Sequence, residues 1–239
     1  MRVDVPHEWP ADEAEARALQ DRLRPLADHL GPGPSDPRYV AGLDVAYAGN
    51  GRGTGDLVAA AVVVIDMATL AVAEQSTAVA RTTFPYVPGL FAFRELPVLV
   101  EALRALRITP DLLLCDGHGL AHPRRFGLAC HLGVLTGLPT AGVAKTPFTG
   151  RHDPAALPQA RGSHTPLTDG TETVGRALRT QPGVKPVYLS TGHLIDLPTT
   201  TTHVLTLTPA YRLPETTRHS DHLSRQTLAA AQATAPEPA

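Results

Sequence analysis

Acidic side chains stand in three places where the surrounding sequence is strongly apolar. Asp116 ends the apolar run Leu112–Cys115, Asp44 lies inside the strand-like run Tyr39–Tyr47, and Glu95 precedes an amphipathic helical pattern. A carboxylate among buried residues is costly to desolvate unless a cation or hydrogen-bond donors accompany it. Carboxylate oxygens suit hard divalent cations, which leave room for a substrate phosphate. The sequence therefore indicates a metal site for phosphoryl chemistry.

Two of these acids also have an ordinary structural interpretation. Asp116 could simply cap the turn that follows its strand, although a cap does not explain the glycine, histidine and arginine concentrated in residues 117–125. Asp44 could equally be an edge-strand residue that faces water. Its own segment does not decide between a solvated side chain and a ligand.

Glycines and basic residues follow the strand-like run Leu112–Cys115 closely. Gly117 and Gly119 can adopt backbone conformations that bring the main chain close to a ligand, at the end of the strand where open α/β sheets bind ligands. His122 is as compatible with a place near metal or phosphate as with a hydrogen-bonded turn. Two arginines could contact phosphate, or could pair with surface acids at a helix start: Arg124 and Arg125.

Four segments of the chain, taken together, resemble the endonuclease V family. They follow the family's order between about Trp9 and Ser224, so the resemblance covers nearly the whole chain. The PYVPG and DGHGLAHPRR parts are specific, whereas GLDVAY alone would be weak. The segments are GLDVAY around Asp44, PYVPG with the following FRE at Pro85–Glu95, DGHGLAHPRRFGLACHLG at Asp116–Gly133 and PTAGVAK ending at Lys145, with a weaker echo, RLPETTRHSDHLS, at Arg212–Ser224.

The resemblance implies a fold and an activity that composition alone does not indicate. The fold would be an α/β, ribonuclease H-like domain with a central mixed β-sheet flanked by helices. The activity would be that of a metal-dependent DNA repair endonuclease, which nicks the second phosphodiester bond 3′ to hypoxanthine (deoxyinosine) and leaves a 3′ hydroxyl and a 5′ phosphate. Three alternatives stay open: an inosine-specific endoribonuclease, a non-catalytic hypoxanthine or nucleic-acid binder of the same fold, and a same-fold nuclease for junctions or hybrids.

Specific roles come with the resemblance. Lys145 matches the family's active-site lysine and would orient water or phosphate, although most lysines are solvated surface residues. Asp221 would be a supporting fourth carboxylate, unless the neighbouring His222 takes that position. The expected cofactor is Mg²⁺, for which Mn²⁺ should substitute. The residues expected to bind it or to act in catalysis are Asp44, Glu95, Asp116, Asp221, His122 and Lys145.

The resemblance also implies a wedge and a pocket that recognise the base. The stiff segment Pro85-Tyr86-Val87-Pro88 is similar to the family's wedge, with Tyr86 able to stack where a base has left the helix. Its alternative is a rigid loop with a half-buried tyrosine. Main-chain groups would form the hypoxanthine pocket around Phe91, Gly117, Gly119 and Phe148.

Composition and charge limit the classes of protein that fit. A chain of 239 residues with 43% hydrophobic content can bury one sizeable core, which predicts a single domain over residues 1–227 and a disordered tail at 228–239. A net charge of −2 excludes a protein that coats DNA nonspecifically. We expect a monomer whose partner is DNA that contains a deaminated purine, with inosine-containing RNA as the alternative, and whose nonspecific affinity is weak and salt-dependent.

The location of the protein can be predicted from apolar runs and cysteines. No run approaches the ~20 apolar residues of a membrane span. The first residues, MRVDVPHEWP, lack the apolar core of a signal peptide. Cys115 and Cys130 fall in predicted buried elements, as core thiols of a reducing compartment do. We therefore expect a cytoplasmic protein without a membrane partner or a structural zinc.

The apolar pattern predicts the elements that position these residues. A helix at 11–30 should bend or divide at Pro25, and Pro97 should lie in the first turn of a helix or mark a kink if that helix begins earlier. The threonine-rich segment 197–207 has no clear pattern. We expect strands at 38–47, 57–66, 70–80, 112–116, 140–144, 174–179 and 187–190, and further helices at about 95–106 and 125–136.

Overall fold

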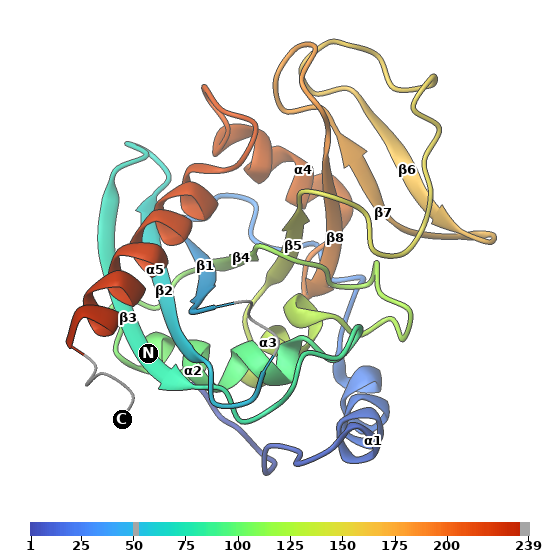
Figure 1. Cartoon of the computed structure of the whole chain (residues 1–239). Helices are drawn as coiled ribbons and strands as arrows, with labels where there is room; N and C mark the ends of the chain where they lie inside the picture. Colours follow the sequence, from blue (N-terminus) through green and yellow to red (C-terminus); the bar gives the residue numbers. More distant parts are fainter. Residues whose placement is uncertain (50–52, 235–239) are drawn as a thin grey trace.

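The computed structural model describes residues 1–49 and 53–234 and shows one mixed β-sheet with helices on both faces (Figure 1). The strands are β1 (Tyr39–Tyr47), β2 (Leu57–Asp66), β3 (Val72–Arg81), β4 (Leu112–Cys115), β5 (Thr140–Ala144), β6 (His164–Asp169), β7 (Glu172–Leu178) and β8 (Val187–His193). The helices are α1 (Glu13–Leu23), α2 (Ala92–Arg104), α3 (Leu128–Thr136), α4 (Leu197–Thr206) and α5 (Glu215–Thr234), with a 3-10 turn at Arg24–Leu26.

The order of the strands is β3-β2-β1-β4-β5-β8-β7-β6. The hairpins β1–β2 and β2–β3 are antiparallel, whereas β1, β4 and β5 are parallel neighbours. This arrangement confirms the predicted α/β fold with a central mixed sheet flanked by helices. Because β1, β4 and β5 run in the same direction, their carboxyl ends meet at one edge of the sheet, where α/β folds place ligands.

Alternate residues of the central strands face two different helical layers. Ala41 and Leu43 of β1 pack in a core with α2 and α3, while Val40 packs in a second core with residues of α4 and α5. Helix α5 approaches the sheet closely because β1 carries Gly42, where a Cβ atom would lie 2.4 Å from the backbone carbonyl carbon of Thr216. The close approach brings the side chains of α5 to the end of β1.

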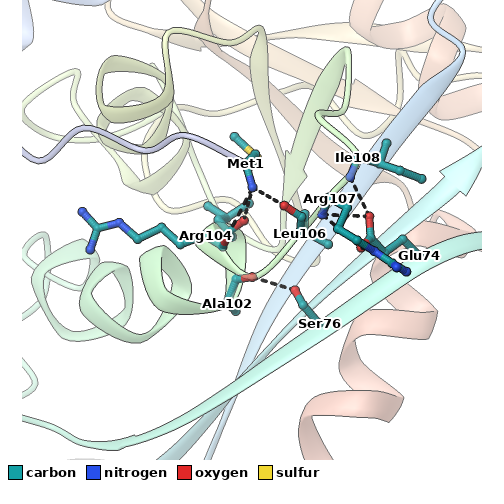
Figure 2. Close-up of polar contacts among 9 residues, drawn as sticks. Met1, Glu74, Ser76, Ala102, Arg104, Leu106, Arg107 and Ile108 are labelled. Atoms are coloured by element: carbon teal, nitrogen blue, oxygen red, sulfur yellow. Dashed lines mark hydrogen bonds and ion pairs between the residues drawn. The ribbon is translucent and has the colours of Figure 1, made fainter.

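The carboxyl end of helix α2 is tied to the outer strand β3 (Figure 2). The Glu74 carboxylate of β3 accepts hydrogen bonds from the backbone N–H groups of Arg107 and Ile108, at 3.0 and 2.7 Å. Ser76 Oγ donates to the Ala102 carbonyl oxygen at 2.7 Å. The Ser76 bond satisfies a carbonyl group at the helix end, the Glu74 bonds pair N–H groups of the turn that follows, and together they hold the helix that carries Glu95 against the sheet.

Most predicted elements are confirmed, and the differences have physical causes. The helix predicted at 11–30 is divided at Pro25 as expected, but Ala27 is already extended, so its continuation to residue 30 is wrong. Helix α2 begins at Ala92, which places Pro97 inside it. Strand β6 was not predicted. The threonine-rich segment forms α4, where Asp196 accepts a hydrogen bond from the backbone N–H of Thr199 and so caps the helix.

The chain end differs from the prediction. Helix α5 continues to Thr234, so residues 228–234, predicted to be a disordered tail, are helical. Leu228 is buried, which explains why the helix continues past residue 227. The rest of the predicted tail, residues 235–239, lies outside the described residues. None of the described helices is long and apolar enough to cross a membrane, and both cysteines are buried, as predicted.

Candidate active site

The ends of three neighbouring strands bring two acids and a lysine together. Leu43 of β1 pairs with Cys115 of β4, so Asp44 and Asp116, one residue further along each strand, lie side by side. Lys145 follows the next strand, β5, and its Nζ donates to Asp116 Oδ2 at 2.6 Å. The parallel arrangement of β1, β4 and β5 thus assembles residues that are about a hundred positions apart in the chain.

Glu95 reaches the same site from helix α2. Its side chain is 5% exposed, and Tyr47 at the end of β1 donates a hydrogen bond from its hydroxyl to Glu95 Oε1 at 2.9 Å. Burial raises the pKa of Glu95 well above its ordinary value; Asp44 and Asp116 raise this pKa further, while Tyr47 and Arg94 oppose the shift. The shift shows that Glu95 lies within the electrostatic reach of both strand-end acids.

Asp44 is the centre of this charge cluster. Ser224 on α5 donates from Oγ to Asp44 Oδ2 at 2.6 Å. Burial raises the pKa of Asp44, as do the neighbouring charges of Asp116 and Asp221, whereas Ser224 and Lys145 oppose the shift. A carboxylate that is both partly desolvated and repelled by two others favours a cation nearby. This removes the alternative of an edge-strand Asp44 that faces open water, since β1 lies between β2 and β4.

Asp221 lies on α5 beside Asp44. The two residues line the same cavity of about 380 Å³, whose lining does not include His222. Arg225, one turn further along α5, donates from Nη2 to Asp221 Oδ1 at 2.8 Å. Partial burial lowers the pKa of Lys145, but Asp116 raises it by a larger effect, and the negative charge of Asp221 adds to that increase. The structure therefore places Asp221 in the charge cluster, whereas His222 lines a neighbouring cavity together with Lys145 and Asp221.

The four carboxylates have the oxygen atoms and the negative charge that suit a hard cation, but their side chains do not surround one position. No group of three or more His, Cys, Asp and Glu side chains among residues 1–49 and 53–234 is arranged so that it could hold a metal ion as it stands. In each carboxylate one oxygen accepts a bond named above, and no described residue donates to the other. The oxygens left for a ligand are Asp44 Oδ1, Glu95 Oε2, Asp116 Oδ1 and Asp221 Oδ2. Oxygen donors with excess negative charge fit Mg²⁺, which keeps waters and needs few protein ligands.

An apolar cavity of about 360 Å³ opens next to the acids. It lies between the wedge loop, residues 84–90, and the segment that follows β4. Tyr86 and Phe148 stand at its rim, 45% and 46% exposed, and the Phe148 ring packs against those of His118 and His122, at 6.1 and 5.6 Å between centroids. The residues around the cavity are Gln20, Tyr86, Pro88, Gly89, Phe91, Ala92, Gly117, His118, His122, Phe126, Gly127, Leu128, Thr146, Pro147 and Phe148.

Three of the four residues predicted for a base pocket line this cavity, and one does not. Phe91, Gly117 and Phe148 are in its wall. Gly119 instead faces β8, where an added Cβ would lie 2.1 Å from the Thr191 carbonyl oxygen. The prediction for Gly119 is therefore corrected: the glycine allows close approach, but of a strand and not of a ligand.

His122 belongs to the cavity wall and not to the acid cluster. Its side chain is buried; Nε2 donates to the Gly89 carbonyl oxygen at 3.0 Å, and Nδ1 accepts from the backbone N–H of Arg124 at 3.1 Å. Burial lowers the pKa of His122 to about 4, so the ring is neutral at physiological pH. The structure favours the alternative of a hydrogen-bonded turn residue, which here holds the wedge loop.

The two arginines after His122 pair with acids. Arg124 contacts Asp21 at 2.5 Å. Arg125 contacts both Asp169 and Glu172 at 2.8 Å. The alternative of pairing with surface acids is thus the one that the structure shows, and a phosphate contact would have to displace these partners.

Comparison with known proteins shows which family has this arrangement. The family model for endonuclease V matches residues 26–222. The chain belongs to the endonuclease V family. It is 58% identical to the endonuclease V of Streptomyces coelicolor over 230 residues, which are 95% of this chain and 96% of that protein. Endonuclease V is a nuclease, so the acid cluster belongs to an enzyme that hydrolyses phosphodiester bonds.

Solved structures of endonuclease V share the fold. The crystal structure of the Streptomyces avermitilis protein has a TM-score of 0.88 at 54% identity, with 97% of this chain and 100% of that chain covered. A structure of Ciona intestinalis endonuclease V, in complex with a 24mer DNA containing an inosine followed by a ribo-adenosine, has a TM-score of 0.77 at 27% identity, with 91% and 98% covered. The fold and the family therefore agree.

Several residues of the site were not predicted from the sequence. Tyr47 and Ser224 end the GLDVAY and RLPETTRHSDHLS segments, so their position in an endonuclease V motif was a usable signal. The sequence signal for Gln20 and His118 is weaker. Gln20 is only a glutamine on an amphipathic helix, and His118 is a histidine between two glycines. Gln20 lies before the residues that the endonuclease V family model matches.

Proposed function

We propose that this endonuclease V homologue is a metal-dependent DNA repair enzyme that nicks the second phosphodiester bond 3′ to hypoxanthine, leaving a 3′ hydroxyl and a 5′ phosphate. The observation that carries the proposal is the direct linkage of the apolar cavity to the acids. Gly117 of the cavity wall follows Asp116, and Phe91 lies one helical turn before Glu95. A base held in the cavity would therefore have its flanking phosphates next to the carboxylates.

The carboxylates would hold Mg²⁺, with Mn²⁺ as the expected substitute. When bound, the ion would lower the pKa of an attacking water and neutralise charge on the leaving 3′ oxygen. Asp44, Glu95 and Asp116 would be the ligands and Asp221 a supporting one. Their raised pKa values (Asp44 and Glu95) and free oxygens support this assignment.

The remaining polar residues orient the site. Tyr47 and Ser224 each hold one oxygen of a ligand carboxylate, so the other oxygen has a fixed direction. The pKa of Lys145 is raised: partial burial lowers it, but the hydrogen bond and charge of Asp116 outweigh that effect. Lys145 is therefore protonated at neutral pH and supplies a compact positive charge for phosphate or water at the acid cluster.

The wedge and the cavity would select the base. Extruding a base costs a few kcal/mol, and least for a mispaired one, so Tyr86 at the rim is placed to fill the gap that remains. Hypoxanthine lacks the exocyclic amine of adenine and the 2-amino group of guanine. A wall that fits hypoxanthine closely can reject both by leaving no room and no partner for those groups.

DNA is the first candidate substrate, because the Ciona relative was solved with inosine-containing DNA. The ribo-adenosine after the inosine in that oligonucleotide keeps inosine-containing RNA as the second candidate. Cleavage of matched inosine-containing DNA and RNA oligonucleotides with Mg²⁺, Mn²⁺ and EDTA tests both, and end-labelling maps the cut. Cleavage that persists in EDTA, or that is equal on undamaged DNA, would contradict the proposal.

A further inference from the structure

Gln20 on helix α1 is a polar side chain in an almost wholly buried position. Only 1% of the residue is exposed, and it lines the apolar cavity. Its Nε2 donates to two carbonyl oxygens, that of Gly89 at 2.9 Å and that of Phe126 at 3.3 Å. One amide group therefore bridges two separate segments of the cavity wall.

The two carbonyls belong to the two loops that face each other across the cavity. Gly89 lies near the end of the wedge loop, and its backbone has a positive φ of 83°, a conformation that fixes the turn after Pro88. Phe126 belongs to the segment between β4 and α3. His122 of that second segment also donates to the Gly89 carbonyl, at 3.0 Å. The distance between the loops is thus set by polar bonds that converge on Gly89.

The other end of the Gln20 amide has no hydrogen-bond partner among residues 1–49 and 53–234. Both partners of Nε2 are carbonyl oxygens, which only accept, so the orientation of the amide is fixed and Oε1 must be the remaining atom. Within the described part of the chain, this buried Oε1 has no hydrogen-bond partner. An apolar side chain of the same length would fill the position without leaving a buried acceptor unpaired. The two hydrogen bonds of Nε2 are therefore what a glutamine adds at this position.

We propose that Gln20 is a positioning residue that determines specificity: it ties the wedge loop to the segment after β4, and so fixes the width of the cavity that receives an extruded purine. The proposal rests on the proposed function. Since Gln20 bonds the loops and not the carboxylates, it acts on the choice of base and not on the hydrolytic step. Loosening the tie lets the wedge loop move away, and bases with an additional amino group then fit.

The test compares two variants of the full-length protein. Gln20→Met keeps the length of the side chain and removes both hydrogen bonds. Leu19→Ala is the matched control, because Leu19 is the adjacent buried residue of α1, packs with Phe84 and Phe93, and does not line the cavity. Measured are kcat and KM on DNA with inosine and with guanine at the same position, thermal stability, and hydrogen exchange of residues 84–90 and 117–127.

We expect Gln20→Met to lower the preference for inosine over guanine by about tenfold, mainly through KM, as the loss of buried hydrogen bonds predicts. Hydrogen exchange should rise in both loops. Leu19→Ala should lose thermal stability and keep the preference. If Gln20→Met does not fold, Gln20→Asn, too short to reach both carbonyls, should show the same loss.

Two results would overturn the proposal: a preference unchanged in the Gln20 variants, or an equal loss of preference in Leu19→Ala at matched thermal stability. Failure of the proposed function is distinguishable from both. In that case the wild-type protein itself would show no preference for inosine, so there would be none for the variants to lose.

Discussion

Replacing Tyr86 by alanine tests whether the wedge loop separates strands. The Tyr86 ring is 45% exposed and meets Phe91 edge-on at 6.5 Å between centroids, so it contributes little to the core. Folding stability should therefore change by less than about 0.5 kcal/mol, as for other exposed side chains. The ring is available to stack in the space that an extruded base leaves.

The size of the effect follows from stacking. Base–aromatic contacts are worth about 1–3 kcal/mol, so Tyr86→Ala should weaken binding to an inosine-containing duplex by about 5- to 150-fold. Tyr86→Phe keeps the ring and is the matched control; it should remain close to the wild type. The assay is binding in Ca²⁺ and single-turnover cleavage in Mg²⁺, on duplex and single-stranded inosine DNA.

The comparison of the two substrates decides the interpretation. A single strand needs no separation, so its loss should be smaller than that of the duplex. Equal losses on both would mean that Tyr86 contacts the base directly without acting as a wedge. No loss on either would leave Tyr86 a structural residue of a rigid loop, and the reasoning would be refuted.

Three further predictions concern the acid cluster. Asp44→Asn, Glu95→Gln and Asp116→Asn should each abolish cleavage but keep part of the binding to inosine DNA; near wild-type cleavage by Asp116→Asn would contradict the site. Lys145→Ala should slow single-turnover cleavage and leave Mn²⁺ binding measurable by calorimetry, whereas an unchanged rate would make it a surface lysine. In metal-free protein, the folded-state pKa of Glu95 lies above its unfolded value, so the folded state holds more protons, and thermal stability should fall as pH rises above about 4.3. Glu95→Gln should flatten that fall, and an identical pH profile would show that Glu95 bears no uncompensated charge.

The sequence predicts the parts of the fold that depend on local pattern. Strands β2 and β5 have the predicted bounds, because continuous apolar runs between turn residues leave few alternatives. Helix α4 could not be predicted, because threonine has low helix propensity and α4 is stabilised by the Asp196 cap and by hydroxyls such as Thr200 Oγ1, which bonds the Asp196 carbonyl. Those bonds depend on where the chain turns, which no periodicity shows.

The residues of the site also fall into those with a local sequence signal and those whose role depends on the fold. Asp44 and Asp116 can be predicted because each interrupts or ends an apolar strand, a local signal. Whether Gly119 approaches a ligand or a strand depends on what lies opposite, and only the position of β8 decides it. Gln20 gives little signal, since its two partners are backbone carbonyls 69 and 106 positions away.

The cavity and the acids share their supports, and this has a consequence for how selectivity would appear. Asp116 and Gly117 are consecutive, and Phe91 lies one helical turn before Glu95 at the start of α2, which is held to the sheet at its far end by Glu74. A base that displaces the wall at Phe91 or Gly117 therefore displaces a carboxylate as well. Small misplacements of reacting groups cost far more in rate than in affinity. Bases that do enter the cavity but fit it poorly should accordingly be bound and yet cut slowly, so this part of the discrimination is expressed in kcat, whereas exclusion by the cavity width that Gln20 sets is expressed in KM.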